Sequence, residues 1–136
     1  MQADHVHLVV EAHDARTLSE GARGLAVRSA RAINRLLGRH GRVWGDRYHT
    51  HTLQSPREVR HGLVYVLFNV RKHQRGWGRQ LDPRSSAASF DGWSDGGAPP
   101  PPPQAEVVRP AQTWLARVGW RRHGLIGLGE SPRRRL

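Results

Sequence analysis

Two histidines, a tyrosine and an asparagine are the side chains of this sequence whose types and spacing could do chemistry together. His5 and His7 are separated by one residue, so on a strand they point to the same face and can chelate one metal ion. Tyr65 and Asn69 are four residues apart, which puts them on one face of a helix. A phenol is a poor nucleophile at neutral pH, but it becomes useful when a metal neutralises the phosphate that it attacks. A histidine pair, a helical tyrosine and a third ligand at Asn69 suit phosphodiester transesterification; the alternative is that Tyr65 only packs at the edge of the core.

Other residues of the same types are weaker candidates. Tyr48 is the only other tyrosine, but it lies on a predicted strand beside Arg47 and has no helical partner four residues on, so packing or a DNA contact is expected of it. His49 and His51 repeat the spacing of the first pair, with no helical nucleophile nearby.

Two segments are predicted to be strands. Residues 5–11 are rich in apolar and β-branched side chains, and residues 43–53 have the same character. Side chains alternate along a strand, so one face of the first segment is wholly apolar and should be buried. Its members are Val6, Leu8 and Val10.

Two helices are predicted between and after these strands. The first should begin at a capping box of Thr17 and Glu20, and Gly38 is well placed just after its end. The second should begin at Ser55, with a proline in the first helical position and Glu58 completing another capping box. Its polar face, opposite an apolar stripe, consists of Glu58, His61, Tyr65, Asn69 and Lys72.

The composition changes near residue 80 and divides the chain into three parts. Residues 1–80 carry the periodic elements, and residues 81–106 read as a linker rich in proline, glycine and serine. The proline run at 99–103 should form a stiff polyproline II spacer. Residues 107–136 form a basic tail in which 111–118 could make a short helix.

The charge favours a polyanionic partner. The formal net charge is +11, and Lys72 is the only lysine, so nearly all of the positive charge is arginine, which suits bidentate phosphate contacts. The sequence contains no cysteine, which excludes a disulfide scaffold and thiolate zinc sites. No apolar run approaches the ~18 residues of a membrane span, and no secretory signal is visible at the start. A cytoplasmic protein without a membrane partner is the expectation.

Several motifs in order resemble one protein family. The run at residues 4–11 (DHVHLVVE) resembles the histidine strand of HUH single-tyrosine transposases, and most closely that of the REP-associated tyrosine transposase family of bacteria. The likeness continues through residues 34–35 (NR) and 41–49 (GRVWGDRYH) to residues 65–69 (YVLFN), which look like the Y-I-x-x-N helix of that family. It covers roughly residues 1–75, in the order and approximate spacing of the family.

The resemblance implies a fold and a set of roles. The fold would be α+β, a ferredoxin-like antiparallel sheet with helices on one face. Tyr65 would attack single-stranded or hairpin DNA and form a 5′-phosphotyrosine link, leaving a free 3′-hydroxyl. His5, His7 and Asn69 would hold Mg²⁺ or Mn²⁺. The residues expected to contact DNA are Arg42, Trp44, Arg47, Arg71 and Lys72.

The chain departs from the family at its start. In the family a strand, a helix and another strand precede the histidine strand, whereas here Met1 lies four residues before His5. The expected sheet is therefore incomplete, with an unpaired edge that would favour self-association as a homodimer. Either the true start lies upstream or the gene is truncated. The expected location is the bacterial cytoplasm, associated with the nucleoid.

Two other functions remain open. An inactive remnant of a transposase would bind any DNA in a salt-sensitive manner and form no covalent adduct. A nucleotide hydrolase of the histidine-triad type would also begin His-Val-His, but Val9 stands where that motif needs its third histidine. Nucleotide hydrolysis that persists after Tyr65→Phe would identify the hydrolase.

Overall fold

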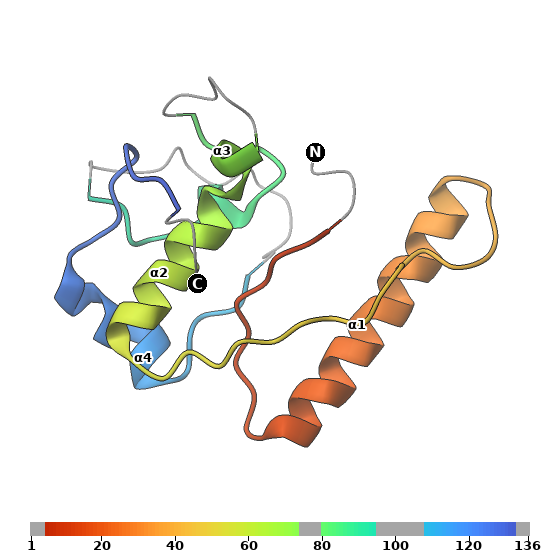
Figure 1. Cartoon of the computed structure of the whole chain (residues 1–136), viewed down its shortest axis with the longest axis horizontal. Helices are drawn as coiled ribbons and strands as arrows, with labels where there is room; N and C mark the ends of the chain where they lie inside the picture. The colour runs from red at the N-terminus through yellow and green to blue at the C-terminus, as the bar shows by residue number, and fades with distance from the viewer. Residues whose placement is uncertain (1–4, 74–79, 95–107, 133–136) are drawn as a thin grey trace. The chain divides into compact units, whose positions relative to one another are not determined.

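The regular structure of the chain is helical. The computed structural model describes residues 5–73, 80–94 and 108–132, and by residue contacts the chain divides into two units, residues 10–52 and the rest. Figure 1 shows the helices in chain order along the colour ramp. The helices are α1 (Ala15–Leu36), α2 (Pro56–Leu67), α3 (Asn69–His73) and α4 (Trp114–Arg117), with 3₁₀ turns η1 (Ser86–Ser89) and η2 (Gly119–His123). No helix in these ranges is long and apolar enough to cross a membrane.

The predicted α+β, ferredoxin-like sheet is wrong, because the described residues contain no strand. Segments 5–11 and 43–53 are irregular, and the β pairing seen in the described ranges is an isolated parallel bridge between Trp93 and Ile126. Alternating apolar residues favour a pleated, half-buried surface, but a strand also needs a neighbour to complete its hydrogen bonds. Within the described residues neither segment has that neighbour. The apolar face expected to be buried is exposed: Val6, Leu8 and Val10 are 65%, 57% and 57% exposed.

Helix α1 begins three residues earlier than predicted. Its N-cap is Asp14, whose carboxylate accepts a hydrogen bond of 2.7 Å from the backbone N–H of Thr17, so the predicted capping box at Thr17 is wrong. Glu20, the expected partner in that box, instead pairs with Arg16 at 2.9 Å. An aspartate is as good an N-cap as a threonine or better, and the earlier one prevails here. The predicted end is confirmed, because Gly38 follows the C-cap with φ of 58°.

The unit of residues 10–52 holds α1 and the segment that returns along it. The indole N–H of Trp44 donates to the carbonyl of Ala26 at 2.9 Å, and the Asn34 amide donates to the carbonyl of Gly41 at 2.8 Å. None of the α1 residues is fully buried. Side-chain to backbone contacts, rather than a packed core, therefore fasten the return segment to the helix.

Helix α2 begins as predicted. The Ser55 hydroxyl accepts from the N–H of Glu58 at 3.2 Å, and the Glu58 carboxylate accepts from the N–H of Ser55 at 3.0 Å, which confirms the capping box. The helix is interrupted at Phe68, which has φ of −116° and ψ of 18°, before α3 resumes at Asn69. The interruption lies between Tyr65 and Asn69, so the two residues belong to different helices.

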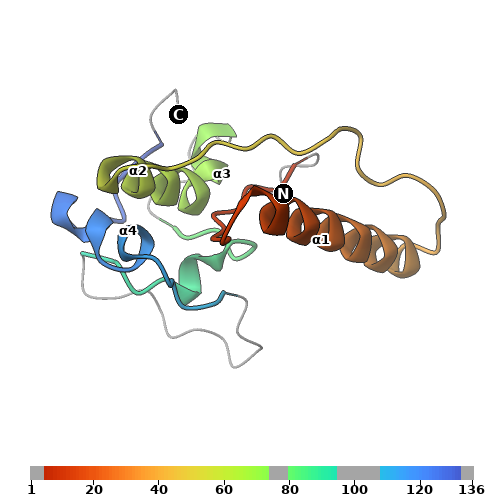
Figure 2. The same ribbon diagram turned by 90° about the horizontal axis from the view of Figure 1, so that it is seen from below.

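The core of the second unit joins α2 to residues far along the chain. Figures 1 and 2 both show α4 lying beside α2. Three aromatic rings pack against one another in this core: the Phe90 ring centroid is 5.1 Å from that of Trp93 and 5.6 Å from that of Trp120. The buried residues are Val59, Val64, Leu67, Phe68, Ala87, Trp93, Trp120 and Ile126. Residues on both sides of the predicted linker therefore pack together with Ala87 and Trp93 from within it; its proline run lies outside the described residues.

Candidate active site

The structure brings His5, His7 and Tyr65 together. The rings of His5 and His7 are 4.7 Å apart between centroids, at an interplanar angle of 75°. The His7 ring is 4.8 Å from that of Tyr65 at an angle of 83°, and His7 Nε2 lies 3.5 Å from Tyr65 Oη, a long hydrogen bond. Tyr65 is 58 residues from His7 in sequence, so the contact is made by the fold. The result is a small group of two imidazoles and a phenol.

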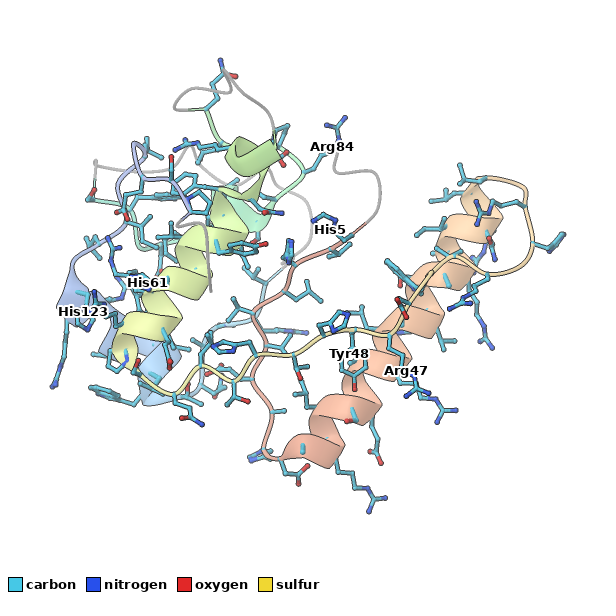
Figure 3. All side chains as sticks on the ribbon, in the orientation of Figure 1. His5, Arg47, Tyr48, His61, Arg84 and His123 are labelled. Atoms are coloured by element: carbon cyan, nitrogen blue, oxygen red, sulfur yellow. The ribbon has the colours of Figure 1, made fainter. Side chains whose placement is uncertain are left out.

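The elements around this group place it at an accessible edge of the unit. Tyr65 lies near the end of α2 and is half-buried, while His7 is half-buried and His5 is exposed on the irregular N-terminal segment. Figure 3 labels His5 on that segment and His61 on α2. Asn69 is 9% exposed and lies in α3, just after the interruption at Phe68.

The donor atoms of the group would suit a divalent cation. Two imidazoles and a phenol oxygen supply nitrogen and oxygen donors, which suit first-row transition ions better than Mg²⁺, an ion that prefers oxygen ligands. Within the described residues no group of three His, Cys, Asp or Glu side chains is close enough to form a complete cage. His5 and His7 would therefore anchor such an ion and leave its other positions for water and substrate, as in catalytic metal sites.

Other polar residues singled out in the sequence have different contacts or positions. The Glu58 carboxylate accepts from the backbone N–H groups of Gln54 and Ser55 at 2.7 and 3.0 Å, so it caps α2. Tyr48, the rival nucleophile, is 53% exposed in the unit of residues 10–52, and Figure 3 labels it next to Arg47. His49 and His51 are exposed in the same unit.

The residues expected to contact DNA differ in how accessible they are. Arg47 is exposed, whereas Trp44 is half-buried against α1. Arg42 donates from Nε to the carbonyl of Trp44 at 2.6 Å and from Nη2 to that of Gly45, which shapes the local loop. Arg71 Nη1 donates to the carbonyls of Leu128 and Glu130 at 2.7 Å each, and its guanidinium lies 4.0 Å from the centre of the Phe68 ring. The side chain of Lys72 lies outside the described ones.

Sequence reasoning missed the residues that attach the C-terminal segment to α2. Arg60 forms two hydrogen bonds to the Glu130 carboxylate, at 2.9 and 2.7 Å, and two more to the carbonyls of Gly124 and Leu125. The pair is separated by 70 residues and both side chains are largely shielded, with exposed fractions of 16% and 32%. No local pattern marks such a pair, because each residue alone resembles an ordinary surface charge.

Comparison with known proteins adds nothing to this geometry. No protein family, no curated protein and no solved structure matches the chain.

Proposed function

We propose that this chain is a tyrosine-dependent DNA strand transferase that cleaves and rejoins single-stranded or hairpin DNA, as HUH single-tyrosine transposases do. The observation that carries the proposal is the contact of His7 Nε2 with Tyr65 Oη at 3.5 Å, with the His5 ring beside it. The proposal rests on this local group and on the resemblance of its motifs, not on a shared sheet. The net charge of +11 supports a nucleic-acid substrate.

The reaction would be a transesterification at phosphorus. Tyr65 Oη forms the new bond to phosphorus while the bond from phosphorus to the 3′-oxygen breaks, so one phosphodiester replaces another and no water is consumed. The phenol loses its proton and the leaving 3′-oxygen gains one. His7 Nε2, which the structure puts against the phenol oxygen, orients the hydroxyl for attack. Attack by a 3′-hydroxyl on the phosphotyrosine reverses these steps and rejoins the strand.

His5 and His7 would hold the divalent cation. When bound, the cation neutralises charge on the scissile phosphate and stabilises the leaving oxygen. Arginine side chains would neutralise DNA phosphates, and Arg42 and Arg47 of the predicted DNA-contact set are both exposed on the return segment.

The test is a covalent-adduct assay on hairpin-bearing single-stranded DNA with Mn²⁺. With the label at the 3′ end, the label should move to a protein-sized band on a denaturing gel. With the label at the 5′ end, the product should be a shorter free strand that a polymerase can extend from its 3′-hydroxyl. Both products should disappear with EDTA and in Tyr65→Phe, which removes the nucleophilic oxygen and keeps the ring.

Tyr48→Phe is the matched control, because it makes the same change at an exposed tyrosine of the other unit. It should leave the adduct unchanged. An adduct that survives in Tyr65→Phe but not in Tyr48→Phe would overturn the assignment of the nucleophile. Salt-sensitive DNA binding without any adduct in the unaltered protein would replace the proposal with that of an inactive, DNA-binding remnant.

A further inference from the structure

An exposed tryptophan and an exposed arginine lie together on the C-terminal turn. The indole of Trp114 is 49% exposed, and the guanidinium of Arg122 lies 4.9 Å from the centre of its ring. Arg117 and Val118 of the same turn are exposed, and so is Leu125, two residues after the end of η2. We call this the α4–η2 surface, and its residues are Trp114, Arg117, Val118, Arg122 and Leu125.

The stretch of chain that forms this surface carries positive charge and contains no acidic side chain. Between Thr113 and Gly129 the sequence has three arginines, one histidine and no acidic residue. Arg121 is committed elsewhere, because it pairs with Asp91 at 2.9 Å and covers the buried Trp120 ring at 4.9 Å. Arg117 and Arg122 form no ion pair with any described residue. The surface is therefore a positive patch that fits an anion.

The tryptophan of this surface is held in a fixed position. A Cβ atom at Gly119 would lie 2.7 Å from Cζ3 of Trp114, so the indole rests directly on the glycine backbone. The Thr113 side chain caps α4 by accepting from the N–H of Ala116 at 3.3 Å, which fixes the first turn of that helix. A rigid aromatic ring that stays half-exposed beside a planar guanidinium can stack on a base with little loss of side-chain entropy.

We infer that the α4–η2 surface binds unpaired nucleotides, with bases stacked on Trp114 or Arg122 and phosphates at Arg117 and Arg122. Stacking platforms flanked by cations are how proteins hold single strands without reading their sequence. A membrane surface fits less well, since the exposed apolar part is one ring and two aliphatic side chains. Figure 3 labels His5 and His123, the sequence neighbour of Arg122, on opposite sides of α2 in that view.

This inference takes its ligand class from the proposed function but does not need the chemistry of Tyr65. The test measures binding of the full chain to a fluorescent short oligothymidine by anisotropy, with a blunt duplex of equal length as the comparison. Trp114→Leu should weaken oligothymidine binding about tenfold, the loss of one stacked base, and should affect duplex binding much less. Trp114→Phe keeps an aromatic face and should bind nearly as the unaltered protein does.

Arginine variants test the charge of the same surface. Arg122→Gln should weaken oligothymidine binding and make the slope of log affinity against log salt shallower by about 0.7. Arg84→Gln removes the same charge from an exposed position of the same unit, labelled in Figure 3, and should have a smaller effect. Equal effects of Arg84→Gln and Arg122→Gln, together with unchanged binding in Trp114→Leu, would overturn the inference in favour of diffuse attraction.

Three further outcomes distinguish this inference from the proposed reaction and from membrane binding. If no adduct ever forms but Trp114→Leu still weakens binding, the proposed reaction fails and the α4–η2 surface stands. If the adduct forms normally while neither Trp114→Leu nor Arg122→Gln alters binding, the reaction stands and the surface fails. Binding of anionic phospholipid vesicles that requires Trp114, with DNA binding unaffected, would assign the surface to a membrane instead.

Discussion

At the scale of single residues, the two histidines of the candidate site should not be equivalent. His7 contacts the Tyr65 hydroxyl as well as the His5 ring, so it would both bind the cation and orient the nucleophile. His5→Gln should raise the Mn²⁺ concentration for half-maximal adduct formation by at least about tenfold, the loss typical even of an outer-shell partner. The adduct should return at high Mn²⁺. His7→Gln should remain slow even when Mn²⁺ saturates, as measured by adduct rate against Mn²⁺ concentration.

His51→Gln is the control for this comparison, since it alters the second histidine pair in the other unit and should shift neither quantity. Full recovery of His7→Gln at high Mn²⁺ would show that its contact with Tyr65 does not assist the reaction. Unchanged half-maximal Mn²⁺ in both variants would show that the pair does not hold the cation.

At the scale of elements, the cap of α1 should make its stability depend on pH. Hydrogen bonds from the backbone and side chain of Thr17 lower the pKa of the Asp14 carboxyl. A lowered pKa in the folded state means that the ionised carboxylate stabilises the helix above the unfolded pKa, and that this stabilisation is lost as the pH falls through the folded pKa. Because no α1 residue is fully buried, the helix relies more than usual on its caps.

The measurement is helical circular dichroism of the full chain from neutral pH to below about pH 4, the range in which an aspartate titrates. Asp14→Asn is the matched control, because asparagine caps helices equally well without titrating. The unaltered protein should lose more helical signal in acid than Asp14→Asn does. Parallel acid curves for the two proteins would mean that the Asp14 cap does not govern α1.

The elements also show which features a sequence can predict. The Ser55 cap and the Gly38 stop were predictable because each depends on residues within one helical turn. The two strands were not, because a strand depends on a distant partner that alternation does not identify. The candidate site likewise has features that local sequence predicts and features that it does not. His5, His7 and Tyr65 were singled out by type and spacing, but the role of Arg71 depends on carbonyls 57 and 59 residues away, which no local pattern reveals.

At the scale of the whole molecule, the C-terminal segment behaves as part of the unit that carries Tyr65. Ile126 is fully buried, donates its N–H to the carbonyl of Gly92 at 2.9 Å and forms the bridge to Trp93. Arg60 fastens the carbonyls around it to α2. If this segment were a detached tail, substitutions in it would leave the stability of α2 unchanged. Because the segment packs against α2, substitutions at its buried residues should lower that stability.

Adjacent residues in this segment allow a sharp test of that requirement. Ile126 is 0% exposed and Leu125 is 40% exposed, so an alanine at each removes a similar side chain from opposite environments. Ile126→Ala should lower the free energy of unfolding by about 2–5 kcal/mol, from lost burial and the cavity left behind. Leu125→Ala should change it by less than about 0.5 kcal/mol. Urea unfolding followed by tryptophan fluorescence, which reports on buried Trp93 and Trp120, gives both values. Equal effects of the two variants would mean that the segment does not share a core with α2.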